Sequence, residues 1–161
     1  MGYSVSITLE DVVIPGDRVE EALQALRGLL AASSHYSWVS NEHVAAALEA
    51  GDLPEALAQW RYSCALGTPL SASAQVARAG RGLAPYADVL IQGFTGGKWG
   101  SDEILWTTLG PFIRPGIPEH SDPRITCRGE DGYEWRYCFT EGGLVKQEMS
   151  RVWSDIRHSL A

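Results

Sequence analysis

Cysteine is scarce in this chain of 161 residues, which contains only Cys64, Cys127 and Cys138 and no CxxC pair. An odd and scattered set argues against a disulfide framework and favours buried thiols in a reducing compartment. Cys127 and Cys138 are placed to approach each other across a hairpin, but sequence alone does not give disulfide geometry.

Long apolar runs are also missing. No stretch approaches the ~20 residues that a transmembrane helix needs. The first eleven residues, MGYSVSITLED, lack the basic start and apolar core of a signal peptide. We therefore expect a cytoplasmic protein with no membrane association. A chain of this length buries enough surface to fold as one domain, so residues 1–161 are predicted to form a single domain.

Positive charge is in short supply, with 13 basic against 20 acidic residues and a net charge of −7. Residues 1–67 hold three arginines and nine acidic residues. Without a basic patch, direct nucleic-acid binding is not expected. The acidic half either is a solvated helical surface, which is the favoured interpretation, or mimics nucleic acid toward a basic protein.

Catalytic and metal-binding motifs are absent as well: the sequence contains no GxSxG, HExxH, HxH or CxxC pattern. The glycine loop at 93–100 (GFTGGKWG) resembles a phosphate loop, but Gln92 stands where the Walker spacing requires glycine and Trp99 replaces the magnesium-binding hydroxyl residue. We expect no cofactor, no metal and no catalytic residue. Whether the protein is an enzyme stays open, with a non-enzyme favoured.

The first half of the sequence predicts one strand followed by helices. Residues 3–9 alternate as a strand does. A capping box at Asp17 and Glu20 predicts one helix start, and a second capping box at Asp52 and Glu55 predicts another. Between them, a helix is expected from Ser40 to a stop at Gly51. Residues 67–87 predict either a mobile loop or an irregular helix over 71–81.

The second half predicts a strand at 88–94, a helix capped by Ser101, and a three-stranded antiparallel meander. Its strands are expected at 124–128, 133–140 and 144–153, with aromatic side chains along one face of the second strand. Asp131-Gly132 predicts a type I′ hairpin turn. Helices followed by a meander indicate the α+β class.

The predicted functional surface lies where the 93–103 loop meets the C-terminal sheet. Lys98 and Trp99 are expected to be exposed anchors there, because the surrounding glycines leave little side chain to cover them. Asp102, Trp106 and Trp38 complete the predicted set. The two tryptophans are expected at or near loops, and tryptophan is a favoured interface residue, while Asp102 stands at the start of the helix that follows the glycine loop.

Part of the chain resembles a group of small proteins, without an assigned activity, from bacterial, prophage and mobile-element genomes. The matching segments are 96–103 (GGKWGSDE), Pro111-Phe112, 129–132 (GEDG), 135–137 (WRY), Phe139 and Val152-Trp153. The resemblance spans residues 88–153, and the proline-rich stretch at 114–123 departs from it. It implies a small accessory protein and carries over no activity.

Three functional hypotheses follow. The first is a non-enzymatic binding or inhibitory protein, of phage or mobile-element origin, acting on a host or defence protein. The second is a protein that binds or sequesters a small molecule, such as a nucleotide or metabolite. The third is a small enzyme of unknown class. A protein partner is favoured by the tryptophans, the acidic charge and the missing catalytic motifs.

Overall fold

The computed structural model describes residues 3–32, 41–65, 70–96, 102–116 and 122–148. The strands in these ranges are β1 (Val5–Glu10), β2 (Val12–Ile14), β3 (Tyr62–Ala65), β4 (Val89–Phe94), β5 (Arg124–Gly129), β6 (Glu134–Thr140) and β7 (Gly143–Glu148). The α-helices are α1 (Val19–Ala32), α2 (Asn41–Glu49), α3 (Leu53–Gln59), α4 (Ala72–Ala79) and α5 (Asp102–Leu109). Short 3₁₀ turns, Gly16–Arg18 and Gly110–Phe112, precede α1 and follow α5.

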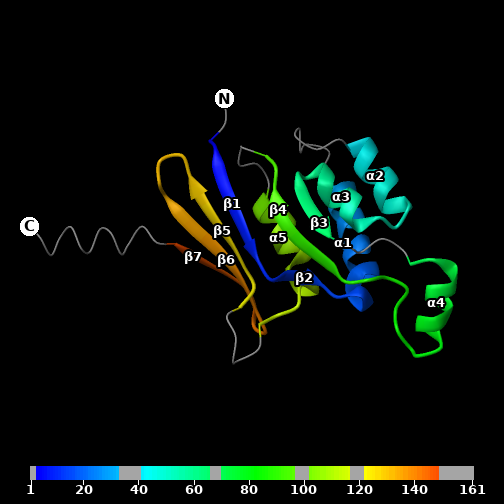
Figure 1. Ribbon diagram of the computed structural model, residues 1–161. Coiled ribbons are helices and arrows are strands. Elements are labelled where there is room, and N and C mark those ends of the chain that lie inside the picture. Colours follow the sequence, from blue (N-terminus) through cyan, green and yellow to red (C-terminus); the bar gives the residue numbers. More distant parts are fainter. Residues whose placement is uncertain (1–2, 33–40, 66–69, 97–101, 117–121, 149–161) are drawn as a thin grey trace, which may run out of the picture.

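The strands form two antiparallel sheets. The larger sheet has the order β1-β5-β6-β7 and the smaller one β2-β4-β3. The two sheets lie side by side in Figure 1, with β1 next to β4. They are linked by Asp11, whose φ of 55° places it in the left-handed region that aspartate tolerates better than most residues. The chain bends at Asp11 and leaves the larger sheet for the smaller one.

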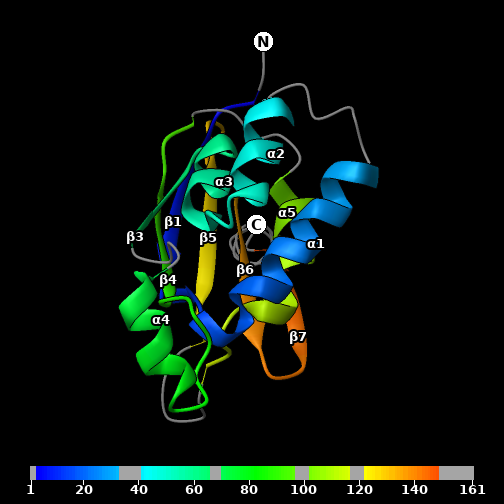
Figure 2. The same cartoon turned by 90° about the vertical axis from the view of Figure 1, so that its right-hand side faces the viewer.

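Helices α1, α2, α3 and α5 lie on one side of the strands (Figure 2). One hydrophobic core joins these helices to both sheets and contains the buried tryptophans Trp60 and Trp106. The two sheets therefore belong to one domain, and the predicted α+β class is confirmed. No helix in the described ranges combines the length and apolar character needed for a membrane span.

The smaller sheet was only partly expected, since β4 was predicted but β2 and β3 were not. β2 has three residues and ends just before Pro15, so it is too short to show the alternation that identifies a strand. β3 begins at Tyr62, and only Trp60, the C-cap of α3, and Arg61 separate the strand from the helix. Arg61 makes this abrupt change possible with a φ of 69°.

The two capping boxes have different outcomes. Asp52 accepts a hydrogen bond from the backbone N–H of Glu55 at 3.1 Å, and Pro54 occupies the first turn of α3, so this helix start is confirmed. The reciprocal bond of a capping box is not formed, because the Asp52 N–H donates to the Ala47 carbonyl at 2.9 Å and the Glu55 side chain accepts from Gln59. The box at Asp17 is wrong as a helix start, because the chain enters α1 through the 3₁₀ turn and Asp17 lies inside that turn. The stop at Gly51 is confirmed by its φ of 70°. The predicted caps Ser40 and Ser101 lie outside the described residues.

The meander is confirmed, with one correction at its first turn. A type I′ turn needs positive φ at both central residues, but only Gly132 has one, with φ 83°. The Gly132 N–H donates to the Gly129 carbonyl at 3.0 Å, and the Gly129 N–H donates to the Tyr133 carbonyl at 2.8 Å. This pattern is a three-residue loop with a left-handed glycine at its end.

The strand predicted over 144–153 is seen as β7, which begins at Gly143 and is described to Glu148. The aromatic stripe on β6 is largely core: Trp135, Tyr137 and Phe139 are buried, and Tyr133 is partly buried. Within residues 67–87, the helical alternative is confirmed over the described part, because α4 occupies Ala72–Ala79 with Ser71 as its N-cap.

The three thiols are free. Cys127 and Cys138 are buried, and Cys64 is partly buried, as expected. The first two do not face each other, because Cys127 is opposite Trp135 and Cys138 is opposite Arg124 in the β5–β6 register. Burial raises the pKa of both the Cys64 and Cys127 thiols to about 12. Both groups are therefore protonated at neutral pH and are poor nucleophiles.

Candidate functional site

A groove in the described surface lies between β1 and the end of β4. β2 pairs with β4 only over Val89–Ile91, and among the described residues β1 pairs with β5 alone. The two neighbouring strands therefore meet near Asp11 and separate toward Ser4 and Phe94. A groove of about 730 Å³ occupies this opening. We call it the β1–β4 groove.

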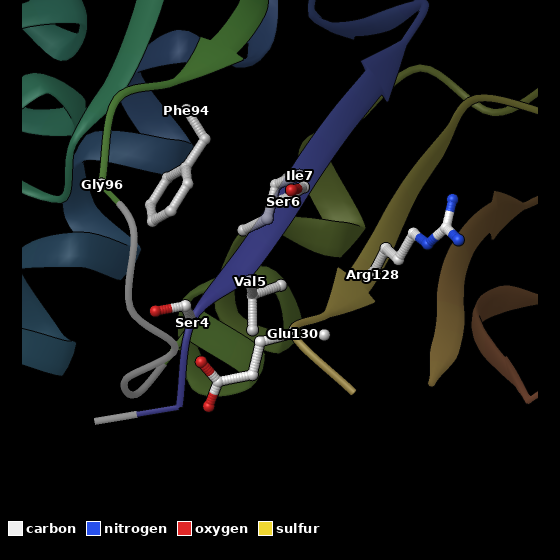
Figure 3. Close-up of a pocket in the computed structure, with 9 residues that line it drawn as sticks. Ser4, Val5, Ser6, Ile7, Phe94, Gly96, Arg128 and Glu130 are labelled. Atoms are coloured by element: carbon white, nitrogen blue, oxygen red, sulfur yellow. The ribbon is translucent and has the colours of Figure 1, made fainter. Parts of the chain in front are cut away.

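Three segments contribute its walls. The first is residues 4–7, which are Ser4 and the first three residues of β1. The second is Phe94, the last residue of β4, with Gly96 just beyond it, and the third is residues 128–130 at the β5–β6 turn. Figure 3 shows the Phe94 ring pointing from β4 toward β1. Val5, Ile7 and Phe94 supply apolar surface, while Ser4, Ser6, Arg128 and Glu130 supply polar groups. The groove thus combines an apolar lining with charges of both signs at its rim.

The rim at the β5–β6 turn is fixed by Tyr3. The Tyr3 hydroxyl donates a hydrogen bond to the Asp131 carboxylate. This bond raises the pKa of Tyr3 to about 12 and lowers the pKa of Asp131 below its usual range. A Cβ at Gly129 would collide with the Tyr3 hydroxyl, so glycine at this position lets the N-terminal segment lie against the turn. The residue just before the groove is therefore anchored at neutral pH.

Behind Phe94 lies a buried polar network that joins β3 to α5. The Phe94 and Tyr62 rings are 5.0 Å apart between centroids. The Tyr62 hydroxyl donates to Asp102 Oδ2 at 2.5 Å and accepts from Trp106 Nε1 at 3.2 Å. Burial, with the nearby Asp102 charge, raises the pKa of Tyr62 well above its usual value. The network fixes the start of α5 against the smaller sheet.

Two of the sequence-predicted site residues belong to this network and not to the surface. Trp106 is fully buried, with its ring edge-on to Tyr62 at 5.0 Å, so it is a core residue and not the loop-side anchor we expected. Asp102 was predicted, from the start of a helix, to take part in ligand or partner binding, yet only 2% of it is exposed. The carboxylate is stabilised by the Tyr62 hydroxyl and by its position at the start of α5, where the helix dipole favours negative charge.

The neighbouring carboxylate, Glu103, ties α5 to the larger sheet. It accepts a hydrogen bond from the Tyr137 hydroxyl at 3.2 Å and lies 3.4 Å from Lys146 Nζ. Asp102 and Glu103 therefore bond to different parts of the fold. In the described residues they do not act as an opposed pair of carboxylates of the kind that general acid–base catalysis uses.

Three predicted site residues, Lys98, Trp99 and Trp38, lie outside the described residues. Lys98 and Trp99 follow Gly96, which lines the β1–β4 groove, and precede Asp102 in the buried network. Of the 93–103 loop, Phe94 and Gly96 line the groove, together with residues 128–130 of the C-terminal sheet. The sequence did not predict that Ser4, Ser6 and Ile7 line a groove. The alternation of a strand shows which residues share a face, but it does not show along which edge the strand is paired.

Comparison of the chain with protein-family models, with curated proteins and with solved structures finds no match.

Proposed function

We propose that this protein is a non-enzymatic binding protein that takes up an extended segment of a protein partner in the β1–β4 groove. One observation carries the proposal: β1 and the part of β4 beyond Ile91 face each other across the groove without pairing in the described part of the chain. Among the described residues, each strand therefore has an edge to which no other strand is paired.

The physical reason is the hydrogen-bonding capacity of strand edges. An edge strand presents backbone N–H and C=O groups that an extended peptide can satisfy by adding to the sheet. In such complexes the backbone supplies affinity, and pockets for alternate side chains supply specificity. Val5, Ile7 and Phe94 offer the apolar contacts for those side chains.

Charge supports a basic partner. The chain carries a net charge of −7, so a positively charged protein is attracted over a long range. At the mouth of the groove, Glu130 is exposed and is positioned to meet a basic side chain. The resemblance to small mobile-element proteins favours an inhibitory role toward a host or defence protein, with Lys98 and Trp99 as further contacts.

A bulky side chain at Ser6 tests the site. Ser6 is exposed and lines the groove, so Ser6→Trp fills space that a bound segment needs without disturbing the core. Thr8→Trp is the matched control, because Thr8 is exposed on the same face of β1, two residues further on, and does not line the groove. The probe is a linear peptide enriched from a random phage-displayed library on the wild-type protein.

We expect Ser6→Trp to weaken peptide binding at least tenfold, or about 1.4 kcal/mol, while Thr8→Trp binds like wild type. Hydrogen exchange should slow in β1 and β4 when the peptide is bound, because added strand pairing protects their amides. Failure to enrich any peptide, or equal binding by the two variants, contradicts the proposal.

A small-molecule ligand is the second candidate, favoured by one observation: about 730 Å³ lies within the range of small-molecule sites. Native mass spectrometry of protein purified from its own host separates the two. A retained metabolite that Ser6→Trp loses and Thr8→Trp keeps supports this candidate over the peptide.

A further inference from the structure

The segment between β3 and β4 forms a projecting arm, residues 70–87, that contains α4. The arm extends away from the sheets at the lower right of Figure 1. The base of the arm is anchored to the start of α1 and the turn before it. Tyr86 Oη donates to Glu20 Oε2 at 3.3 Å, and Asp88, just after the arm, accepts from the Gly16 N–H at 2.7 Å. The hydrogen bonds of the tip join residues of the arm, including Leu70 to Pro85 and Leu83 to Arg78.

The helix of this arm turns its apolar side to solvent. None of the residues of α4 is buried. Ala72, Val76 and Ala79 fall on one helical stripe, and all three are exposed. Val76 is 73% exposed, and Leu83, which follows in the arm, is 46% exposed. A helix of eight residues is marginal in water without packing, so this stripe needs a partner surface.

The arm also differs in charge from the rest of the molecule. Residues 70–87 contain Arg78 and Arg81 and no acidic residue, whereas residues 19–59 contain six acidic residues and one arginine, Arg27. The Arg78 side chain bonds to the Ala84 carbonyl within the arm, and Arg81 is exposed. The arm is therefore a basic, apolar projection on an acidic protein.

A complementary surface lies on α1 and α2. A groove of about 450 Å³ is lined there by Arg27, Leu30, Ala31, Ala45, Leu48 and Glu49. Arg27 is already engaged, since it donates to the Leu48 carbonyl at 2.6 Å and lies 3.6 Å from Glu20. Glu49 is exposed at the rim of the groove. This α1–α2 groove thus offers an apolar floor with an acidic edge.

The arm and the α1–α2 groove lie on the same side of the molecule: Figure 2 shows α1, α2 and α4 in front of the strands. In a two-fold symmetric dimer the same surface of each copy forms the interface, so that surface must contain both the inserted element and the groove that receives it. We propose that this face forms a symmetric dimer in which the α4 arm of each copy seats in the α1–α2 groove of the other. Val76 enters the apolar floor, and Arg81 meets the edge that carries Glu49.

Charge reversal with mixing tests this arrangement. Arg81→Glu and Glu49→Arg each place like charges at both contacts of a homodimer. In a mixed dimer of the two variants, the reversed arm meets the reversed groove and the native arm meets the native groove, so both contacts are attractive. We expect wild-type full-length protein to sediment as a dimer at high concentration, each variant alone to dimerise at least tenfold more weakly, and the mixture to recover wild-type affinity.

Val76→Asp is a second probe: it should give a monomer whose melting midpoint matches that of the wild type at concentrations where the wild type is also monomeric, because the residue is solvent-exposed in the single chain. Arg128→Glu is the control. It makes the same charge change as Arg81→Glu, but on β5 of the larger sheet and outside the proposed interface, so it should leave the dimer intact. A wild-type monomer at every concentration overturns the proposal. So does a dimer that survives Val76→Asp, or a mixture of folded charge variants that fails to associate. None of these results depends on the peptide assay for the β1–β4 groove.

Discussion

Single residues with a left-handed backbone determine where this chain changes direction. Asp11 sends it from the larger sheet to the smaller one, and Arg61 turns it from α3 into β3. The Arg61 carbonyl also accepts two hydrogen bonds from Thr95, from its N–H at 2.8 Å and from its hydroxyl at 3.1 Å. One strained turn therefore helps to hold the end of β4, where Phe94 faces the β1–β4 groove.

Gly132 gives the sharpest prediction at this scale. Its φ is 83°, and an added Cβ would meet no atom within 4 Å, so the cost of a substitution is backbone strain and not a clash. Gly132→Val should lower the free energy of unfolding by about 1–3 kcal/mol, measured by urea denaturation. Gly142→Val is the control: Gly142 lies in the next turn without a positive φ and should change stability by only about 0.5 kcal/mol. Equal effects at the two positions would disprove the turn assignment.

At the scale of elements, α5 is held between the two sheets by polar contacts on either side. Tyr62 of β3 bonds to Asp102 and Trp106, and Tyr137 of β6 bonds to Glu103. Each tyrosine places its ring in the core and its hydroxyl against the polar start of α5. The orientation of α5 therefore depends on both sheets.

Tyr62→Phe tests the buried side of this arrangement. The substitution keeps the ring but removes the donor to a carboxylate that is only 2% exposed, as well as the acceptor of the Trp106 N–H. We expect a loss of about 1–3 kcal/mol in the free energy of unfolding. Tyr86→Phe removes a hydrogen bond to Glu20 at the surface and should cost about 0.5 kcal/mol or less. A Tyr62→Phe protein as stable as Tyr86→Phe would show that the network contributes nothing.

For the whole molecule, stability should be independent of redox conditions. The three thiols are free and take no part in a cross-link, and one hydrophobic core joins both sheets and their helices. The thermal melt should therefore be cooperative and reversible, with the same midpoint with and without reductant. A midpoint that falls on adding reductant would show that a disulfide stabilises the fold in solution.

The sequence by itself determined most of the local structure. The spacing of Asp52, Pro54 and Glu55 predicted the start of α3, because an N-cap bond depends on neighbouring residues only. The meander was predictable from strand alternation, from Gly132 and from the paired glycines of its second turn. These features gave the α+β class without knowledge of any long-range contact.

Only the tertiary structure decided which strand edges have no partner within the described residues and which loop-side residues are buried. From the sequence, Asp102 and Trp106 were expected to be binding residues at the surface. In the structure Tyr62 contacts both of them, although it lies 40 positions before Asp102 and belongs to β3, a strand too short to predict. The β1–β4 groove likewise exists because β1 pairs with β5 while β2 pairs with β4. Such pairings are set by packing between distant segments, and periodicity within one segment does not contain that information.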